Sequence, residues 1–168
     1  RAWPPGTDER RRLTVGGSRA AHGAMLHSEA MPELLRSILE QVRLTTVVDS
    51  EIGARGLSAA AAKTGVTIWI RVEIDMGLNR CGIAPDRAGD LCRLIMDLPG
   101  LELDGLTTFR SSMFSGAGNR TTEELGLEEG QLMVALADSL RATGIPIQAI
   151  SAGSTPTARS AAKVPGVT

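Results

Sequence analysis

Strand-like and helical patterns alternate along the chain from about residue 29, with only short turns between them. Helical spacing of apolar residues covers 31–42, 52–63, 85–98 and 121–143, and strand-like runs cover 44–48, 66–75, 101–109 and 145–150. Strands separated by helices must run parallel, because hairpins join only antiparallel neighbours. The sequence therefore predicts an α/β fold with about four βα units. A closed eightfold barrel needs roughly 250 residues, so 168 residues predict half of a TIM-type (β/α)8 barrel or a small open sheet.

Composition narrows the class of protein. The net charge is -1 and 42% of the residues are hydrophobic, which allows one core and gives no bulk charge for nucleic acid or membrane binding. No apolar run is long enough to span a bilayer. We predict a cytoplasmic protein without nucleic-acid or membrane partners. Cys81 and Cys92 have no metal-ligand spacing with each other or with a histidine, so we expect reduced thiols.

Residues 1–28 follow neither the strand period nor the helix period. They contain Pro4-Pro5-Gly6, a charged run at 8–12 and a pair of glycines, so we predict an irregular or poorly ordered segment without an assigned function. Residues 29–168 form the predicted folded domain. The chain begins with Arg1 and stops at Thr168 without a tail, and we interpret both ends as cut.

The strand predicted at 66–75 has two different faces. Apolar residues occupy one face, and Trp69, Arg71, Glu73 and Asp75 share the other. Central parallel strands are normally apolar on both sides. Three charges in one row therefore indicate either a polar barrel interior, with Arg71 and Glu73 paired, or a functional site.

A glycine turn follows this strand and leads to an arginine. Gly77 permits a sharp turn, and Arg80 would then project at the carboxyl end of the strand, where parallel α/β proteins bind ligands. Glu73 or Asp75 could orient its guanidinium, whose rigid fork of donors suits an anionic or phenolate oxygen. The alternative is an ordinary surface arginine in a loop.

A second candidate segment is Ser151-Ala-Gly-Ser-Thr-Pro-Thr157, directly after the last predicted strand. With Thr155 as N-cap and Pro156 at the first helical position, free backbone N–H groups would face the strand end and could hold a phosphate. The alternative is an ordinary capped helix without a ligand.

Three segments together resemble a known family. They are Val72-Glu-Ile-Asp-Met-Gly-Leu-Asn-Arg-Cys-Gly82, Pro99-Gly-Leu-Glu-Leu-Asp-Gly-Leu106 and the segment 151–157. In this order they resemble the fold-type III pyridoxal-phosphate enzymes with an alanine racemase N-terminal domain, and more closely the D-threonine aldolase and D-serine dehydratase branch. The resemblance covers about residues 40–168. It implies a partial (β/α)8 barrel that lacks the first strand or strands and the β-domain that follows the barrel.

The resemblance also implies a cofactor, pyridoxal 5'-phosphate, and residues that hold it. Arg80 would contact the phenolic oxygen of the cofactor, and Gly153, Ser154 and Thr155 would hold its phosphate. Many alanine racemases have a lysine at the position of Glu73 that steadies the arginine, and Glu73 would take that supporting role.

Two departures from the family pattern concern the chemistry. Family members commonly place a histidine against the cofactor ring near the strand end at 107–112, where this chain has Phe109, which could stack on the ring. The family's Schiff-base lysine lies on the first barrel strand. Lys63 lies in or at the end of a predicted helix and Lys163 follows the phosphate segment, so neither matches, and we assign no catalytic residue. No metal site is predicted, and a divalent metal is expected only in a complete protein.

We therefore predict a fragment of a pyridoxal-phosphate enzyme of D-amino-acid metabolism, most similar to D-threonine aldolase, that does not catalyse alone. A small D-amino acid is the expected substrate, and the complete protein would form a homodimer. The alternatives are a D-serine dehydratase or an amino-acid racemase, a non-catalytic protein that binds pyridoxal phosphate or another phosphate, and a remnant without activity.

Overall fold

The computed structural model describes residues 12–15, 43–110 and 117–168, which form a five-stranded parallel sheet. The strands are β1 (Arg12–Val15), β2 (Arg43–Val48), β3 (Ile68–Ile74), β4 (Leu101–Thr108) and β5 (Ala149–Ser151). Their order in the sheet is their order in the chain, and every pair of neighbours is parallel. The predicted α/β class is confirmed.

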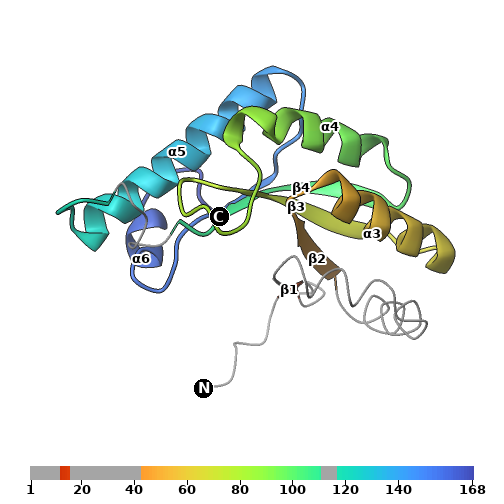
Figure 1. Cartoon of the computed structure of the whole chain (residues 1–168), viewed down its shortest axis with the longest axis horizontal. Coiled ribbons are helices and arrows are strands. Elements are labelled where there is room, and N and C mark those ends of the chain that lie inside the picture. The colour runs from red at the N-terminus through yellow and green to blue at the C-terminus, as the bar shows by residue number, and fades with distance from the viewer. Residues whose placement is uncertain (1–11, 16–42, 111–116) are drawn as a thin grey trace.

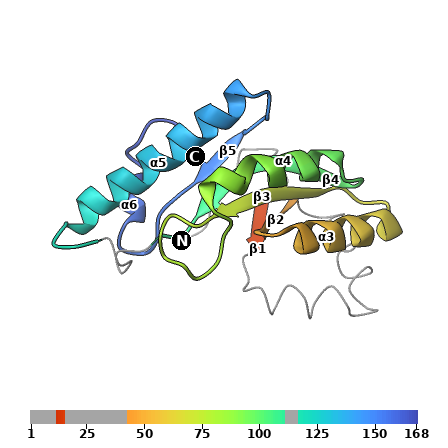
Figure 2. The same ribbon diagram turned by 45° about the horizontal axis from the view of Figure 1, so that its top comes forward.

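Helices connect the strands from β2 to β5, and a short helix follows β5. They are α3 (Glu51–Thr64), the 3-10 helix η1 (Pro85–Arg87), α4 (Ala88–Asp97), α5 (Thr122–Ala142) and α6 (Ala158–Ala161). Buried residues of α3, α4 and α5 pack into one core with the apolar side chains of β3, so these helices cover the same face of the sheet (Figures 1 and 2). A doubly wound sheet would have helices on both faces, whereas strands in chain order with helices on one face build an arc of a (β/α) barrel. In the described part of the chain the arc is open, with β1 and β5 at its edges.

The core lies between β3 and the helices. Burial alternates along β3, and the side chains of Ile68, Ile70, Val72 and Ile74 are at most 1% exposed. Full burial of each such side chain stabilises the fold by about 2 kcal/mol. The helices contribute buried partners to this core, among them Ala61, Leu91, Ile95, Met133 and Ala137. The apolar face predicted for this strand is confirmed.

The opposite face of β3 carries an ion pair that differs from the predicted one. Arg71 Nε donates to Asp104 Oδ2 of β4 at 2.7 Å, and both side chains are largely buried. The predicted pairing of Arg71 with Glu73 is wrong. A register shift explains the difference: Ile70 lies opposite Leu103 but Arg71 lies opposite Gly105, so Asp104 occupies a bulge that strict alternation does not reveal.

Several predicted boundaries also differ. Residues 12–15 form β1 although the segment 1–28 was predicted to be irregular, and the predicted helix at 31–42 lies outside the described residues. The predicted strand at 145–150 shrinks to β5 because Ile145 N still bonds Leu140 O at the end of α5 and Pro146 has no N–H to donate. No helix within the described ranges combines the length and the apolar character needed to cross a bilayer.

Candidate functional site

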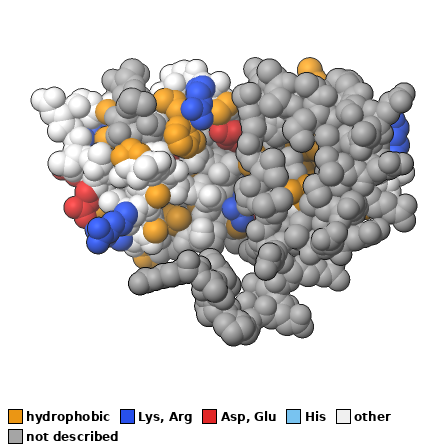
Figure 3. Space-filling model, turned by 90° about the horizontal axis from the view of Figure 1, so that it is seen from below, with side chains coloured by type: hydrophobic (Ala, Val, Ile, Leu, Met, Phe, Trp, Pro, Cys, Tyr) orange, Lys and Arg blue, Asp and Glu red, His pale blue; other side chains and the backbone are white. Residues whose placement is uncertain are grey.

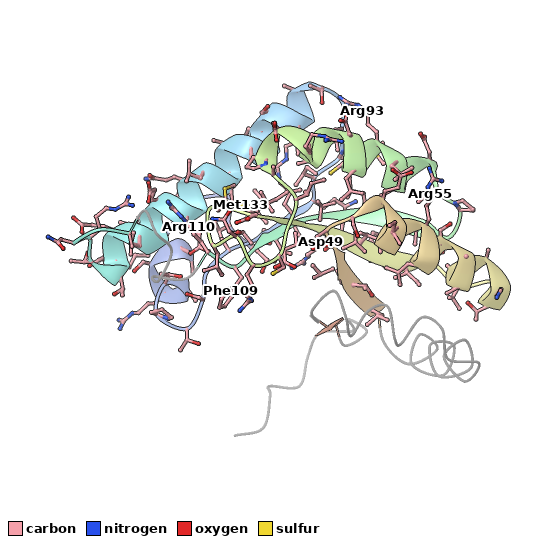
Figure 4. All side chains as sticks on the ribbon, in the orientation of Figure 1. Asp49, Arg55, Arg93, Phe109, Arg110 and Met133 are labelled. Carbon is pink, nitrogen blue, oxygen red and sulfur yellow. The ribbon has the colours of Figure 1, made fainter. Side chains whose placement is uncertain are left out.

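The predicted site residues gather at one edge of the sheet. All strands are parallel, so their carboxyl ends meet there. Arg80 follows β3, Phe109 follows β4, and Gly153 to Thr155 follow β5. Figure 4 shows Phe109 on the lower side of the ribbon and its neighbour Arg110 nearer α5, with Asp49 at the end of β2.

The turn after β3 is built around two aspartates. Asp75 Oδ1 accepts hydrogen bonds from Gly77 N at 2.9 Å and Asn79 N at 3.1 Å, which closes an Asx-type turn. Gly82 has a φ of 102°, and a Cβ there would lie 2.5 Å from Asp75 N, so the position requires glycine. Asp49 Oδ2 accepts from Gly82 N at 3.2 Å and ties the turn to the end of β2. The backbone that carries Arg80 is thereby fixed, and Asp75 supports this backbone through its bonds to the turn.

Arg80 and Phe109 are brought together. The guanidinium carbon of Arg80 lies 4.6 Å from the centroid of the Phe109 ring. Arg80 is exposed, and Phe109 is exposed to 38%, which is high for a phenylalanine. A cation over an exposed ring contributes about 0.5–1 kcal/mol. The contact orients a cationic fork and an apolar ring at the same strand ends.

Glu73 contacts the thiol next to Arg80. Cys81 Sγ donates to Glu73 Oε1 at 3.0 Å. Partial burial raises the pKa of the Cys81 thiol, the hydrogen bond to Glu73 raises it further, and the adjacent Arg80 lowers it. In the described part of the chain the link from Glu73 to Arg80 therefore runs through Cys81, and direct support of Arg80 by Glu73 stays a prediction. Cys81 and Cys92 are both free thiols, as predicted.

The segment after β5 forms a tight turn, but its helix begins later than predicted. Helix α6 begins at Ala158, so the prediction of Thr155 as N-cap is wrong. The turn starts instead at Ser154, whose carbonyl accepts from Thr157 N at 3.0 Å and Ala158 N at 2.8 Å. Ser154 N donates to Thr157 Oγ1 at 2.8 Å, which closes the turn from the other side. Ser154 is buried and Thr155 is exposed.

Gly153 has a backbone conformation with positive φ, which favours glycine. Its φ is 108°, and a Cβ would lie 2.5 Å from the Cα of Ala158. A side chain at this position would therefore push α6 away from the strand end.

Glu129 of α5 is a buried acid at the candidate site that the sequence patterns did not single out. Its side chain is fully buried and lies between the ends of β4 and β5, where Arg110 N and Gly153 N both donate to Oε1. The signal was present in the spacing: Glu129 follows Leu125 by four residues and precedes Met133 by four, so it lies on the buried stripe of the helix. An acid on that stripe indicates a specific partner.

The neighbouring acid, Glu128, bonds the side chain of Arg110, whose backbone N donates to Glu129. Arg110 and Arg120 donate to its Oε2 at 2.8 Å and 2.7 Å. Burial opposes the charge of Glu128, but the hydrogen bonds from Arg120 and Arg110 outweigh it and hold the pKa of this carboxyl below its usual range. The network fixes the start of α5 against the end of β4.

Both lysines of the sequence lie in the described part, and neither directly follows a strand. Lys63 is exposed in the last turn of α3, which precedes the amino end of β3. Lys163 is exposed and pairs with Glu123 at 2.6 Å. That this chain lacks a Schiff-base lysine stays a prediction. The described residues also contain no cluster of three His, Cys, Asp or Glu side chains suited to a metal ion.

Comparison with curated proteins gives relatives that act on D-amino acids or racemise alanine. The chain is 30% identical over 158 residues to D-threo-3-hydroxyaspartate dehydratase of Delftia sp. (strain HT23), which covers 93% of this chain and 42% of that protein. It is 27% identical over 123 residues to D-threonine aldolase of Arthrobacter sp., covering 73% of this chain and 32% of that protein. The chain thus spans well under half the length of these relatives.

Two solved structures superpose on most of this chain. D-threonine aldolase from Filomicrobium marinum superposes with a TM-score of 0.68 at 25% identity, over 81% of this chain and 37% of that one. PipY of Synechococcus elongatus PCC7942, with PLP bound, superposes with a TM-score of 0.60 at 16% identity, over 81% and 61%, which supports the fold alone.

The family profile described as "Alanine racemase, N-terminal domain" matches residues 8–165, almost the whole chain. This match agrees with the parallel strands and the helices on one face. The chain belongs to the alanine racemase N-terminal domain family, whose members depend on pyridoxal phosphate.

Proposed function

We propose that this chain forms the lysine-free part of a pyridoxal 5'-phosphate site in an enzyme of the D-threonine aldolase kind, which cleaves D-3-hydroxy amino acids. The observation that carries the proposal is the pairing of Arg80 with Phe109 at the carboxyl edge of the sheet, beside the loop 153–155. The relatedness to a D-threonine aldolase and a D-threo-3-hydroxyaspartate dehydratase supports the substrate class.

The side chains at this edge fit an anionic aromatic cofactor. Arg80 offers an exposed guanidinium for the phenolic oxygen, and Phe109 offers a partly exposed ring for the pyridine face. Exposed Thr155 offers a hydroxyl and a backbone N–H for the phosphate. Gly153 N and Ser154 N are engaged by Glu129 and Thr157, so in this arrangement those two groups shape the loop.

The cofactor supplies the electron sink for bonds broken at the Cα of the amino acid. The residues of this chain bind and orient it. Because neither Lys63 nor Lys163 directly follows a strand, we propose that the chain alone binds the cofactor without turnover. The same observation favours the second candidate, a non-catalytic protein that binds pyridoxal phosphate or a related phosphate. A dehydratase or racemase assignment, a homodimer and the division of the chain at residue 28 stay predictions.

An equilibrium titration of the full chain with pyridoxal phosphate, followed by its absorbance, tests the proposal. We expect saturable binding at one site per chain that inorganic phosphate competes away. The variant R80A should weaken binding about tenfold or more, because it removes a charge-assisted contact. R87A is the matched control: Arg87 is also exposed but lies on η1, with Asp90 3.6 Å away, and its loss should change the affinity less than twofold. Absence of saturable binding, or equal affinities for R80A and the wild type, would contradict the proposal.

A further inference from the structure

Glu129 is a buried carboxylate that the proposed cofactor contacts do not use. A buried carboxylate is costly unless hydrogen bonds stabilise its charge. Glu129 accepts three: from Arg110 N at 3.0 Å and Gly153 N at 3.2 Å through Oε1, and from Thr157 Oγ1 at 2.9 Å through Oε2. Every partner donates, which is the pattern that an ionised carboxylate requires.

The three donors come from two segments, the chain just after β4 and the two ends of the 153–157 loop. Arg110 follows β4, Gly153 follows β5, and Thr157 directly precedes α6. One carboxylate therefore fixes the position of the 153–157 loop relative to the end of the neighbouring strand. Two of the donors belong to the 153–157 loop, and the third, Arg110 N, is the backbone amide that directly follows Phe109, so Glu129 ties the loop to the strand end that carries this ring.

Glu129 also sets the direction of the hydroxyl protons in the loop. The single hydroxyl proton of Thr157 goes to Glu129 Oε2. Thr157 Oγ1 accepts from Ser154 N at 2.8 Å, and because its own proton is used, the 2.9 Å bond to Ser154 Oγ must be donated by Ser154. The conformation of Ser154 thus depends on the carboxylate through Thr157.

Two glycines allow α5 to come close enough for this contact. A Cβ at Gly126 would lie 2.5 Å from Thr157 O, and a Cβ at Gly130 would lie 2.8 Å from a methyl carbon of Val164. These positions flank Glu129 by three residues and by one residue along the same helix. The close approach of α5 and the segment around α6 therefore serves the carboxylate as well as the core.

We propose that Glu129 is a positioning residue that holds the 153–157 loop in the conformation that receives a phosphate group, without touching that phosphate. The inference rests on the proposed cofactor site and adds how its phosphate loop is shaped. It predicts that removing the charge of Glu129 weakens phosphate binding, which is the opposite of what charge repulsion alone would give. A nearby negative charge repels phosphate, so a purely electrostatic role predicts tighter binding when the charge is removed. A positioning role predicts weaker binding, because the neutral side chain has one acceptor oxygen for three donors.

The test compares E129Q with E128Q in the full chain. Both variants remove one negative charge from adjacent positions of α5, but Glu128 bonds Arg110 and Arg120 side chains and no atom of the loop. Titration with pyridoxal phosphate, and separately with inorganic phosphate, should give about tenfold weaker binding for E129Q, equivalent to about 1.4 kcal/mol, and less than a twofold change for E128Q. T157V should weaken binding like E129Q, and T157S, which keeps the hydroxyl, should retain wild-type affinity.

A second readout separates this inference from the proposed function. Hydrogen exchange of the Gly153 amide should be faster in E129Q than in the wild type and E128Q, while thermal unfolding shows E129Q still folded. If the wild type binds no pyridoxal phosphate but the Gly153 amide still loses protection in E129Q, the proposed function fails and the positioning role stands. Tighter ligand binding by E129Q, or unchanged Gly153 exchange in E129Q, would overturn the inference.

Discussion

At the scale of single residues, the polar side chains on β3 each have a partner that alternation along the strand does not identify. Arg71 pairs with Asp104 across a bulge, and Glu73 accepts from Cys81 in the following turn. The sequence predicted which face these residues share, because that depends only on the period of two. It did not predict the partners, because a one-residue bulge changes the register without changing the pattern of apolar residues.

Replacing Glu73 by glutamine should make Cys81 more reactive. Glu73 raises the pKa of the Cys81 thiol through its hydrogen bond and its charge, so E73Q lowers that pKa and increases the thiolate fraction at pH 8. Alkylation by iodoacetamide, located by peptide mass, should accelerate severalfold at Cys81. Cys92 is the internal control, since burial raises its pKa to about 12 and it is fully buried.

The matched variant for this measurement is D86N, which removes an exposed acid from η1 and should leave the Cys81 rate unchanged. An unchanged or slower rate in E73Q would contradict the assigned contact.

Burial of Cys92 makes the stability of the protein depend on pH. The neutral Cys92 thiol contributes stability that is fully present below its ordinary pKa of 9.0 and is lost as the pH rises toward about 12. Chemical unfolding of the wild type between pH 8 and 10.5 should show this loss, which C92A should lack in part.

At the scale of elements, long periodic segments were predicted well and short ones poorly. The helix predicted at 121–143 is observed at Thr122–Ala142, where Thr121 and Glu124 form a capping box. Helix α6 has four residues, and its start depends on bonds made by Ser154 and Thr157 to one another and to Glu129. Such tertiary contacts produce no periodic pattern in the amino-acid sequence, which is why the prediction of Thr155 as N-cap was wrong.

Substituting alanine for Gly126 should destabilise the protein although alanine is the better helix former. A Cβ at Gly126 would lie 2.5 Å from Thr157 O, so the packing of α5 against α6 must open. Overpacking of this kind costs about 1–3 kcal/mol, more than the gain of up to about 1 kcal/mol in helix propensity. Urea unfolding measures the difference.

Gly89 in α4 is the control for that substitution. A Cβ there would lie 3.4 Å from the flexible ends of Arg93 and Leu140, an ordinary contact, so G89A should be neutral or stabilising by up to about 1 kcal/mol. If G126A is as stable as G89A, then α5 and α6 are not held at the distance that the Glu129 contacts require.

At the scale of the whole molecule, the described strands form an open arc with helices on one face. The candidate site lies at the edge where the carboxyl ends of the strands meet. Figure 3 views the molecule from below, where basic, acidic and hydrophobic side chains of the described residues are interspersed. The arc and its turn motifs could be predicted from sequence because crossover connections and strand-end glycines leave clear patterns. The proposal that the chain alone does not catalyse rests on the described strand ends, where neither Lys63 nor Lys163 directly follows a strand.

The measurement that tests the central claim most directly is intact-mass spectrometry of the chain after saturation with pyridoxal phosphate and reduction with borohydride. We expect saturable binding that phosphate competes away, and no stoichiometric covalent adduct, because Lys63 lies in the last turn of α3, Lys163 follows α6, and neither directly follows a strand. K63R and K163R should bind pyridoxal phosphate as the wild type does. A stoichiometric adduct on one lysine, together with turnover of D-threonine by the chain alone, would contradict the account.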